Sequence, residues 1–286
     1  MDEIWIDGGF APAPGAVAAN DRGLTLADGV FDTSLVLGGR VFRQEAHLDR
    51  LMAAAAGLAI PADRAGLELA MTARAERRGD GAIRLTLTRG PGARGLAFPA
   101  DPQPTLIGTT APLAPAMMFA PLRLEVSEIR RNETSPTARV KSLAYLDSVL
   151  ANHAARQAGA DEALFLNGAA RVACSALANV FVLAGTEIVT PPRDDGVLDG
   201  IVRGWILDNA GAFGMSAVER PLTLPDLAAG QIVLTNSLRL VAPASLDGPA
   251  PAMPAPILRA LMEGLCAAIA EECGVDPRER GAVLPG

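Results

Sequence analysis

The sequence predicts a chain of the α+β or α/β class that is divided into two domains. Its 286 residues, half of them hydrophobic, are enough to bury one large core or two cores of ordinary size. Short runs typical of strands alternate with longer runs typical of helices along most of the chain. Near Thr109 the composition changes to TTAPLAPAMMFAP, whose prolines and alanines suit an interdomain linker. We therefore expect a small N-terminal domain over residues 1–110, a linker over 111–122 and a larger domain over 123–286.

The elements expected in the small domain follow from local composition and periodicity. The runs EIWID (3–7) and GRVFR (39–43) resemble strands on either side of a loop. The stretch HLDRLMAAAAGLA (47–59) has helix-forming composition. The run AIRLTLTRG (82–90) alternates in the manner of a strand and ends in the glycine-rich loop RGPGARGLAFP.

The larger domain is expected to contain five strands and three helices. The strand-like runs are LRLEV (122–126), EALFL (162–166), NVFVLA (179–184), EIVT (187–190) and QIVLT (231–235). The helix-like runs extend from Ser142 to Ala158, from Ile201 to Ala210 and from Ile257 to Glu272. This mixture supports the α+β or α/β class and leaves the order of the strands open.

The overall charge argues against a nucleic-acid partner. The formal net charge is −7 and no long basic run is present, whereas binding to a phosphate backbone needs clustered positive charge. The start, MDEIWIDGG, lacks the basic-then-apolar layout of a signal peptide. No apolar run reaches the ~18 residues of a membrane span. We therefore expect a cytoplasmic protein that binds neither nucleic acid nor a membrane.

The cysteines and histidines form neither a disulfide pattern nor a metal pattern. Cys174, Cys266 and Cys273 lack CxxC spacing and the density of a disulfide-rich domain. The two histidines, His47 and His153, have no CxxC pair to join them. No metal site is expected.

Lys141 is the only lysine, because the other 24 of the 25 basic residues are arginine. An exposed cation tolerates exchange of lysine for arginine, but a lysine can lose its proton and its neutral amine can attack a carbonyl. Lys141 is therefore a candidate Schiff-base lysine or general base. The alternative is a surface lysine that is present by chance, and uniqueness alone does not separate these readings.

The stretches around Lys141 resemble the fold-type IV pyridoxal-phosphate enzymes. This family includes branched-chain and D-amino-acid aminotransferases and aminodeoxychorismate lyases, and the resemblance to the lyases is the closest. It covers about Ile4 to Ala244. In order, the motifs are DRGLTLADGVFDT, HLDRL, KSLAYLDSVLANHAARQAGADEALFLN from Lys141, NVFV, TPP, GIVRG and LTNSLRLVAP.

The resemblance implies a cofactor, an architecture and an assembly. The implied fold is the two-domain α+β or α/β fold of the D-amino-acid-aminotransferase type, with a barrel-like larger domain. Pyridoxal 5'-phosphate would lie in the interdomain cleft, and the protein would be a homodimer. Lys141 would be the Schiff-base residue, and its amine would also move the substrate proton.

The resemblance also implies a set of residues around the cofactor phosphate. Arg50 in HLDRL matches the family's phosphate arginine, whose planar donors suit phosphate oxygens. Ile201 and Val202 begin the helix whose backbone N–H groups would cup the phosphate. Asn236 and Ser237 would add side-chain donors. Apart from the resemblance, each of these residues would suggest only a turn or a helix cap.

One position departs from the family. Relatives carry a glutamate five residues before Asn179, where it keeps the pyridine nitrogen protonated, and this chain has Cys174 there. A thiol, whose ordinary pKa is about 8.5, favours a neutral pyridine. The enzyme could run an elimination that needs less electron withdrawal, use a carboxylate from elsewhere, or bind the cofactor with little turnover. A small buried apolar role for Cys174 is compatible with all three.

Four residues are candidates for the substrate pocket. Arg94 lies in a loop that resembles the RGxGxRG run of the lyases, where D-amino-acid aminotransferases place a carboxylate-binding arginine; their nearby histidine is replaced by Leu96. Arg239, in the lyase-like LTNSLRLVAP run, is a candidate for a second carboxylate. Either arginine could instead be solvated. Phe31 and Thr33, which flank Asp32, match the strand that lines the pocket in this family.

These comparisons leave three hypotheses for the function. The first is an aminodeoxychorismate lyase, which releases pyruvate and p-aminobenzoate from a small amino substrate with two carboxylates. The second is an aminotransferase that uses D-amino acids or other donors with a 2-keto acid acceptor. The third is a cofactor-binding protein with little turnover, which Lys141 argues against. Branched-chain enzymes place a tyrosine where this chain has Leu146, with Tyr145 one residue out of register, which argues against that activity.

Overall fold

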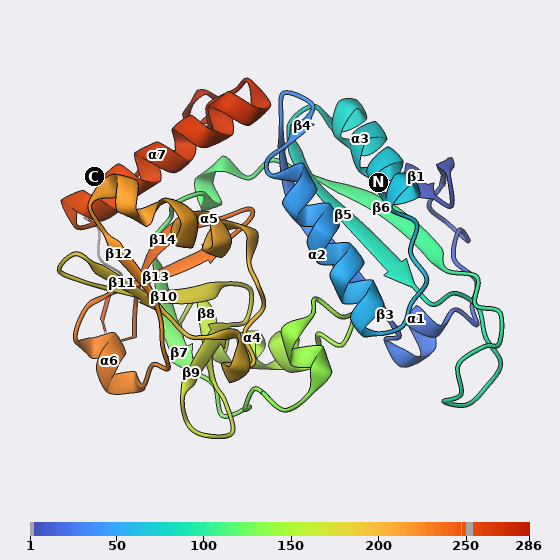
Figure 1. Ribbon diagram of the computed structural model, residues 1–286, viewed down its shortest axis with the longest axis horizontal. Coiled ribbons are helices and arrows are strands. Elements are labelled where there is room, and N and C mark those ends of the chain that lie inside the picture. Colours follow the sequence, from blue (N-terminus) through green and yellow to red (C-terminus); the bar gives the residue numbers. More distant parts are fainter. Residues whose placement is uncertain (1–2, 247, 250–253) are drawn as a thin grey trace. The chain divides into compact units, whose positions relative to one another are not determined.

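The computed structural model describes residues 3–246, 248–249 and 254–286, which fold into two compact units (Figure 1). The first two residues of the acidic start, and residues 247 and 250–253 of the expected larger domain, lie outside the described part. The first unit comprises residues 1–113, 140–144 and 271–275, and the second comprises residues 114–139, 145–270 and 276–286. The predicted mixture of helices and strands is confirmed.

The first unit contains a six-stranded antiparallel sheet in the order β2-β1-β6-β5-β3-β4. The strands are β1 (Glu3–Ile6), β2 (Gly9–Pro12), β3 (Gly29–Leu37), β4 (Arg40–Val41), β5 (Gly81–Thr88) and β6 (Thr105–Pro112). The helices are α1 (Arg22–Leu26), α2 (Gln44–Gly57) and α3 (Arg64–Arg78). The core of this unit joins α2 and α3 to alternate residues of the strands, so both helices cover the same face of the sheet.

Local sequence explains how α2 and α3 form. The run of four alanines from Ala53 favours a helix in α2. At the start of α3, the side chain of Asp63 accepts hydrogen bonds from the backbone N–H groups of Ala65 and Gly66, as an N-cap does. The expected helix over 47–59 is therefore present and begins three residues earlier, at Gln44.

The second unit contains an eight-stranded sheet in the order β12-β11-β10-β13-β14-β7-β8-β9. An additional pairing between β9 and β10 closes six of these strands into a barrel-like ring. The strands are β7 (Leu122–Val126), β8 (Glu162–Leu166), β9 (Val172–Ser175), β10 (Asn179–Ala184), β11 (Glu187–Thr190), β12 (Ser216–Glu219), β13 (Gln231–Asn236) and β14 (Leu240–Ser245). Buried Leu and Val residues from these strands form the core of the ring.

Helices and short 3-10 turns complete the two units. The α-helices are α4 (Leu146–Gln157), α5 (Ile201–Asn209), α6 (Leu224–Ala228) and α7 (Pro256–Cys273). The 3-10 turns are η1 (Pro115–Met117), η2 (Pro136–Arg139), η3 (Arg193–Asp195), η4 (Ala210–Phe213) and η5 (Pro277–Arg280). Among the described residues, no helix combines the length and apolarity needed to cross a bilayer.

Three segments differ from the expectations drawn from composition. The helix expected from Ser142 begins only at Leu146, because Ser142 pairs with Val30 of β3 in an antiparallel bridge. The run GRVFR forms a strand only over Arg40–Val41. In the stretch expected to be a linker, residues up to Pro112 pair with β5 as part of β6, because the prolines fall at the end of the strand.

Candidate functional site

Lys141 is held by backbone pairing with β3, within the first unit. The N–H of Phe31 donates to the carbonyl of Lys141 over 2.8 Å, and the N–H of Leu143 donates to the carbonyl of Gly29 over 3.0 Å. This edge of β3 is available because β4 is only two residues long and pairs with Val36 and Leu37 at the other end of β3. The short β4 therefore leaves room for the lysine segment.

Gly29 allows this segment to approach β3 closely. A Cβ atom at residue 29 would lie 2.7 Å from Cδ1 of Leu143 and 2.9 Å from the carbonyl oxygen of Leu87, both too short for non-bonded contacts. The glycine of the motif ADGVFDT therefore has a steric role beside the lysine.

The side chains of Lys141 and Arg84 both approach the ring of Phe31. The Nζ atom of Lys141 lies 4.6 Å from the ring centroid, and Cζ of Arg84 lies 3.7 Å from it. Thr33 is paired with Arg84 across β3 and β5, and shares the face of Phe31 because alternate residues of a strand point the same way. The structure thus brings together Lys141, Phe31 and Thr33. Arg84 joins them, which the sequence reasoning missed.

Asp32 points to the opposite face of β3, where α2 packs. Its two carboxylate oxygens bind two residues of α2: Nδ1 of His47 lies 2.5 Å from Oδ1, and Nε of Arg50 donates to Oδ2 over 2.8 Å. His47 and Arg50 are three residues apart and therefore share one face of the helix. Asp32, which the sequence groups with the pocket strand, instead orients the arginine expected to bind phosphate.

Burial and neighbouring charges shift the pKa values of Asp32 and His47 in opposite directions. Burial raises the pKa of Asp32, but the charges of Arg50 and His47 and their hydrogen bonds outweigh burial and hold that pKa at about 2. Burial lowers the pKa of His47 below its usual value, with Asp32 opposing the shift. Asp32 is therefore ionised at neutral pH, and His47 is a neutral donor that helps to orient it.

In the second unit, Cys174, Asn179 and Thr235 form one row across the barrel, called here the seam row. Asn179 of β10 is paired with Cys174 of β9, the pair that closes the ring, and with Thr235 of β13. Paired residues of antiparallel strands point to the same face, so the three side chains lie side by side. All three are buried, with exposed fractions of 9% or less.

The start of α5 lies against the seam row. A Cβ atom at Gly200, the N-cap of α5, would lie 1.9 Å from Oδ1 of Asn179, so only glycine fits at this position. Nδ2 of Asn179 donates to the carbonyl of Leu198 over 2.8 Å and holds the turn before the helix. Ile201 and Val202 open the helix and are buried. The structure thus confirms the predicted helix start at Ile201.

This arrangement offers hydrogen-bond donors to an anion. No side chain among the described residues caps the first turn of α5. The hydroxyl of Thr235 is buried and has no hydrogen-bond partner within the described part of the chain. Backbone N–H groups at a helix start, the helix dipole and an unsatisfied hydroxyl together suit phosphate oxygens. The residues present therefore fit the phosphate of pyridoxal 5'-phosphate.

Asn236 and Ser237 lie at the turn between β13 and β14. Oδ1 of Asn236 accepts from the backbone N–H groups of Leu238 and Arg239 over 2.9 and 2.7 Å. Its Nδ2 donates to the carbonyl of Leu177 over 3.3 Å. Asn236 thus shapes the turn that presents half-buried Ser237, while Thr235, one residue earlier, carries the unsatisfied hydroxyl. The sequence signal for Thr235 was its place as the first residue of the TNSL motif.

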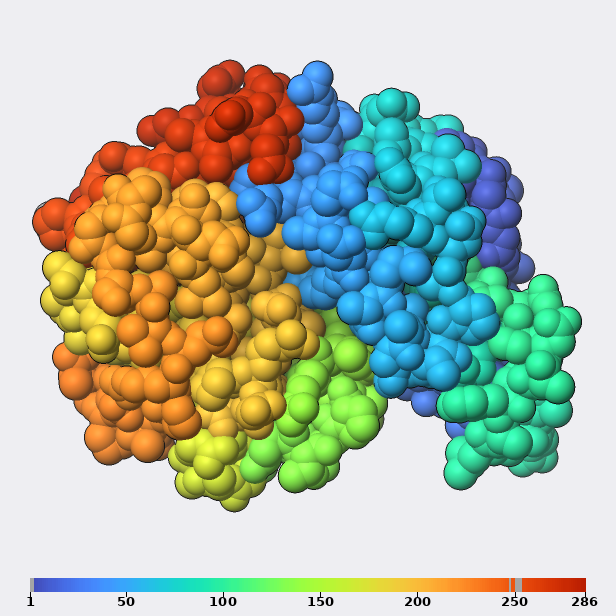
Figure 2. Space-filling model, viewed as in Figure 1, coloured from blue at the N-terminus to red at the C-terminus, as the bar shows by residue number. Residues whose placement is uncertain are grey.

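The two candidate carboxylate-binding arginines have different surroundings. Arg94 is exposed in the loop between β5 and β6. Figure 2 shows this loop, coloured teal, at the surface of the first unit. Arg22 anchors this loop by donating to the carbonyls of Gly95 and Ala97, each over 3.2 Å. Arg239, in the second unit, is half-buried, and its Nη1 reaches the carbonyl of Met117 at 3.5 Å.

Glu162 is a buried carboxylate close in sequence to the strand of Cys174, but it lies on the other side of that strand. It accepts hydrogen bonds from Oγ of Ser175 over 2.5 Å and from the N–H of Leu177 over 2.8 Å. Ser175 and Cys174 are neighbours in β9, so their side chains point to opposite faces. Glu162 therefore supports the turn after β9 and does not stand in for the missing glutamate.

Known proteins resemble this chain over most of its length. The family model described as "Amino-transferase class IV" matches residues 29–246. A Methanocaldococcus jannaschii protein provisionally named a branched-chain-amino-acid aminotransferase is 33% identical over 254 residues, 86% of this chain and 88% of its own. The aminodeoxychorismate lyase of Bacillus subtilis is 29% identical over 251 residues, 84% of this chain and 85% of its own. The crystal structure of 4-amino-4-deoxychorismate lyase from Pseudomonas aeruginosa matches with a TM-score of 0.82 at 30% identity, over 95% of this chain and 100% of that one.

The low pKa of Asp32 predicts a pH-dependent contribution to stability. Because that pKa is about 2 in the folded protein, against about 3.9 for an ordinary aspartate, its contribution is complete above about pH 4 and is lost as the pH falls through 2. The difference corresponds to about 2 to 3 kcal/mol. Urea unfolding of wild type and Asp32→Asn at pH 5 and pH 2.5 measures it. The wild type should lose more stability than the variant, and exposed Asp101→Asn serves as control. Equal losses in the wild type and Asp32→Asn would contradict the assignment.

Proposed function

Because the chain belongs to the class IV aminotransferase family, whose members are pyridoxal-phosphate-dependent enzymes, we propose that it is a lyase of the aminodeoxychorismate type. The substrate would be a small amino compound with two carboxylates, and the products would be pyruvate and p-aminobenzoate. The observation that carries the choice of a lyase is Cys174, which stands in the seam row at the position where the family resemblance implies a glutamate. The nearby carboxylate of Glu162 faces away from it, as its bond to Ser175 requires.

The groups proposed to hold pyridoxal 5'-phosphate are a lysine, an arginine, a helix start and a hydroxyl. Lys141 would bind it covalently through Nζ, and Arg50 would pair with its phosphate. The start of α5 and the hydroxyl of Thr235 would donate to the phosphate as well. When bound, the cofactor supplies an electron-accepting ring that makes a proton beside the substrate amino group removable.

Lys141 would move the proton. Its amine would take the proton from the carbon that bears the substrate amino group, a task that an arginine cannot perform at neutral pH. Phe31, whose ring centroid lies 4.6 Å from Nζ, would contact the amine in the pocket. Arg94 and Arg239 would each bind a substrate carboxylate, and Thr33 would line the pocket with Phe31.

The alternative is an aminotransferase that uses D-amino acids or other donors with a 2-keto acid acceptor. The observation in its favour is the name of the Methanocaldococcus jannaschii relative, an aminotransferase. A complete transamination cycle benefits from a protonated pyridine nitrogen, which a thiol supports less than a carboxylate does. The family resemblance implies a tyrosine at position 146 for branched-chain activity. This chain has Leu146 there, with 67% of the residue exposed, which argues against that activity.

The proposed assembly is a homodimer, and the proposed location is the cytoplasm. The three cysteines are free thiols, as is common in a reducing compartment. Each unit exposes large apolar side chains that a second copy would cover. In the first unit these include Leu24, Leu96 and Phe98, which are 61 to 82% exposed. In the second unit they are Leu146, Val149 and Leu150 at one side of α4.

Light scattering of the purified protein tests the assembly. Because the chain has a mass of 29.5 kDa, a dimer should give twice that value. Leu96→Glu combined with Phe98→Glu should shift the species toward the monomer, since buried charge opposes association. A monomeric wild type would contradict this part of the proposal.

Pyruvate release tests the reaction itself. Cofactor-loaded protein is incubated with aminodeoxychorismate and no keto acid acceptor, and pyruvate is followed over many turnovers. Sustained release is expected, with a fall of about 10²- to 10⁴-fold or more in Lys141→Ala, because the proton carrier is removed. Borohydride should trap the cofactor on the wild type and not on Lys141→Ala. Absence of release from protein that still traps its cofactor would favour the aminotransferase, and absence of any trapped cofactor would contradict the role of Lys141.

Substitution of Cys174 tests its influence on the reaction. Cys174→Glu should raise the rate of transamination relative to pyruvate release, because a carboxylate favours a protonated pyridine nitrogen. Cys174→Ser is the matched control, since a hydroxyl of similar size is also neutral. Both rates are measured on the same preparations with a donor amino acid and a keto acid. An identical ratio in Cys174→Glu and wild type would show that the thiol does not direct the chemistry.

A further inference from the structure

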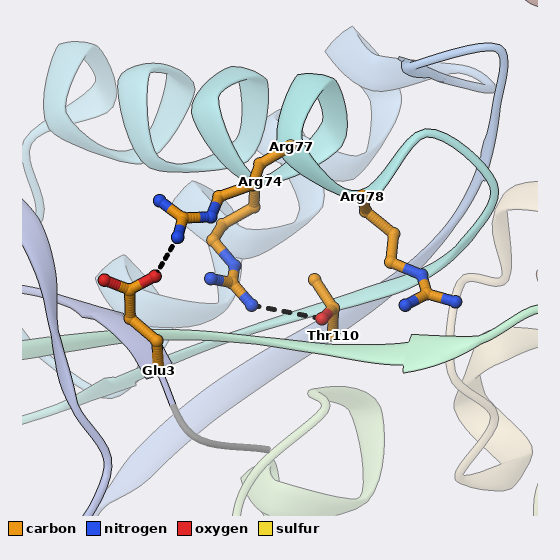
Figure 3. Close-up of a pocket in the computed structure, with 5 residues that line it drawn as sticks. All are labelled: Glu3, Arg74, Arg77, Arg78 and Thr110. Atoms are coloured by element: carbon orange, nitrogen blue, oxygen red, sulfur yellow. Dashed lines mark hydrogen bonds and ion pairs between the residues drawn. The ribbon is translucent and has the colours of Figure 1, made fainter.

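A polar pocket lies in the first unit, and its residues have no part in the proposed reaction. Its volume is about 190 Å³, and it is lined by Glu3, Arg74, Arg77, Arg78 and Thr110 (Figure 3). Pockets for drug-sized ligands are generally ~300–1,000 Å³, so this one suits a small ion or group. Three of the five lining residues are arginines.

The fold gathers these side chains from one helix and two strands. Arg74, Arg77 and Arg78 belong to the last turns of α3 and are spaced so that they share one helix face. On the sheet below, Trp5 of β1 is paired with Gly108 of β6. Glu3 and Thr110 each lie two residues along their strand from this pair, and therefore point to the same face.

Arg74 lies at the base of this pocket, over the sheet. A Cβ atom at Gly108 would be 3.3 Å from Cγ of Arg74, so the glycine makes room for the arginine stem. The residue is only 4% exposed. Its Nη2 donates to Oγ1 of Thr110 over 3.1 Å (Figure 3). Its Nε is buried and has no hydrogen-bond partner in the described part of the chain.

Arg89 shows how the same unit satisfies another buried arginine. Nε and Nη2 of Arg89 donate to the carboxylate of Asp28 over 2.8 and 3.1 Å. Nη2 also donates to the carbonyl of Leu58 over 2.7 Å, and Nη1 donates to the carbonyl of Ala59 over 2.6 Å. Arg74 forms no ion pair with a carboxylate among the described residues. A buried cation without a counter-charge is costly, which makes an added anion favourable here.

The charges around the pocket are unbalanced. Among the described residues, the only carboxylate in its lining is that of Glu3, which pairs with Arg77 at the rim (Figure 3). Burial lowers the pKa of Arg74, and the neighbouring charge of Arg77 lowers it further, with Glu3 opposing. The ring of Phe10 lies 4.3 Å from Cζ of Arg77 and 5.3 Å from that of Arg74, and restricts both guanidinium groups. The site is thus held in place and carries excess positive charge.

We propose that this pocket binds a phosphate-sized oxyanion, with Arg74 at its base and Arg77 and Arg78 at its rim. Guanidinium groups bind phosphate oxygens through paired N–H donors, and Arg74 lines the pocket with no carboxylate paired to it among the described residues. Glu3 competes with the anion for Arg77. The ligand is either free inorganic phosphate or the phosphate group of a small ester. The proposal does not depend on the reaction assigned to the protein.

Calorimetric titration of the cofactor-loaded protein with inorganic phosphate tests this site. One phosphate per chain should bind, and Arg77→Gln should weaken the affinity by about tenfold or more, because a charged donor pair is lost. Arg64→Gln, at the exposed start of the same helix, removes the same charge outside the pocket and should leave the affinity unchanged. Glu3→Gln should bind several-fold more tightly, since the competing carboxylate is removed. Thr110→Val should bind more weakly without a change in net charge.

Two further arms separate the site from others and identify the source of the phosphate. Arg50→Gln alters the proposed cofactor site and should leave phosphate binding intact. Titration with glycerol 3-phosphate identifies the source. Tighter binding of glycerol 3-phosphate than of inorganic phosphate would indicate an ester, and weaker binding would indicate the free ion. The proposal is overturned if no phosphate binds at ~10 mM. It is equally overturned if Arg77→Gln and Arg64→Gln bind alike, or if Arg50→Gln abolishes binding.

Discussion

The backbone pairing between residues 141–143 and the first half of β3 is the interaction on which the candidate site depends. The chain leaves the first unit after Leu113 and returns to it for Val140–Ala144, where two hydrogen bonds to β3 receive it. Gly29 makes the close approach possible. Because the contact uses backbone atoms, the side chain at residue 141 is not needed to form it. The pairing therefore does not itself require a lysine at this position.

The sequence predicted local elements well and long-range pairing poorly, for physical reasons. Periodicity identified β8, β10 and α7, and the ordered motifs indicated the family, which the family model and a solved lyase structure confirm. The start of α4 was placed too early, because composition cannot show that Ser142 pairs with β3. The seam row depends on register across three strands, so nothing local connects Thr235 with Asn179. The turn of Asp32 toward α2 likewise follows from strand alternation combined with helix packing.

Buried charge is handled in two ways within the first unit. Asp32 is surrounded by Arg50 and His47, so each of its oxygens has a partner and the carboxylate stays ionised. The arrangement also fixes the orientation of the Arg50 guanidinium group. Arg74 is buried with only a hydroxyl as its described side-chain partner. A network with every partner in place supports a fixed geometry, whereas an incomplete one leaves capacity for a ligand.

The closure of the barrel by one residue pair has a consequence for how this protein can diverge. Asn179 and Cys174 form the whole register between β9 and β10, and Asn179 also restricts residue 200 to glycine. Position 174 therefore belongs both to the pair that joins the two strands and to the row beside the start of α5. A side chain placed there must pack beside Asn179, whatever chemistry it contributes. A change of chemistry at this position is therefore also a change in the packing where the barrel closes.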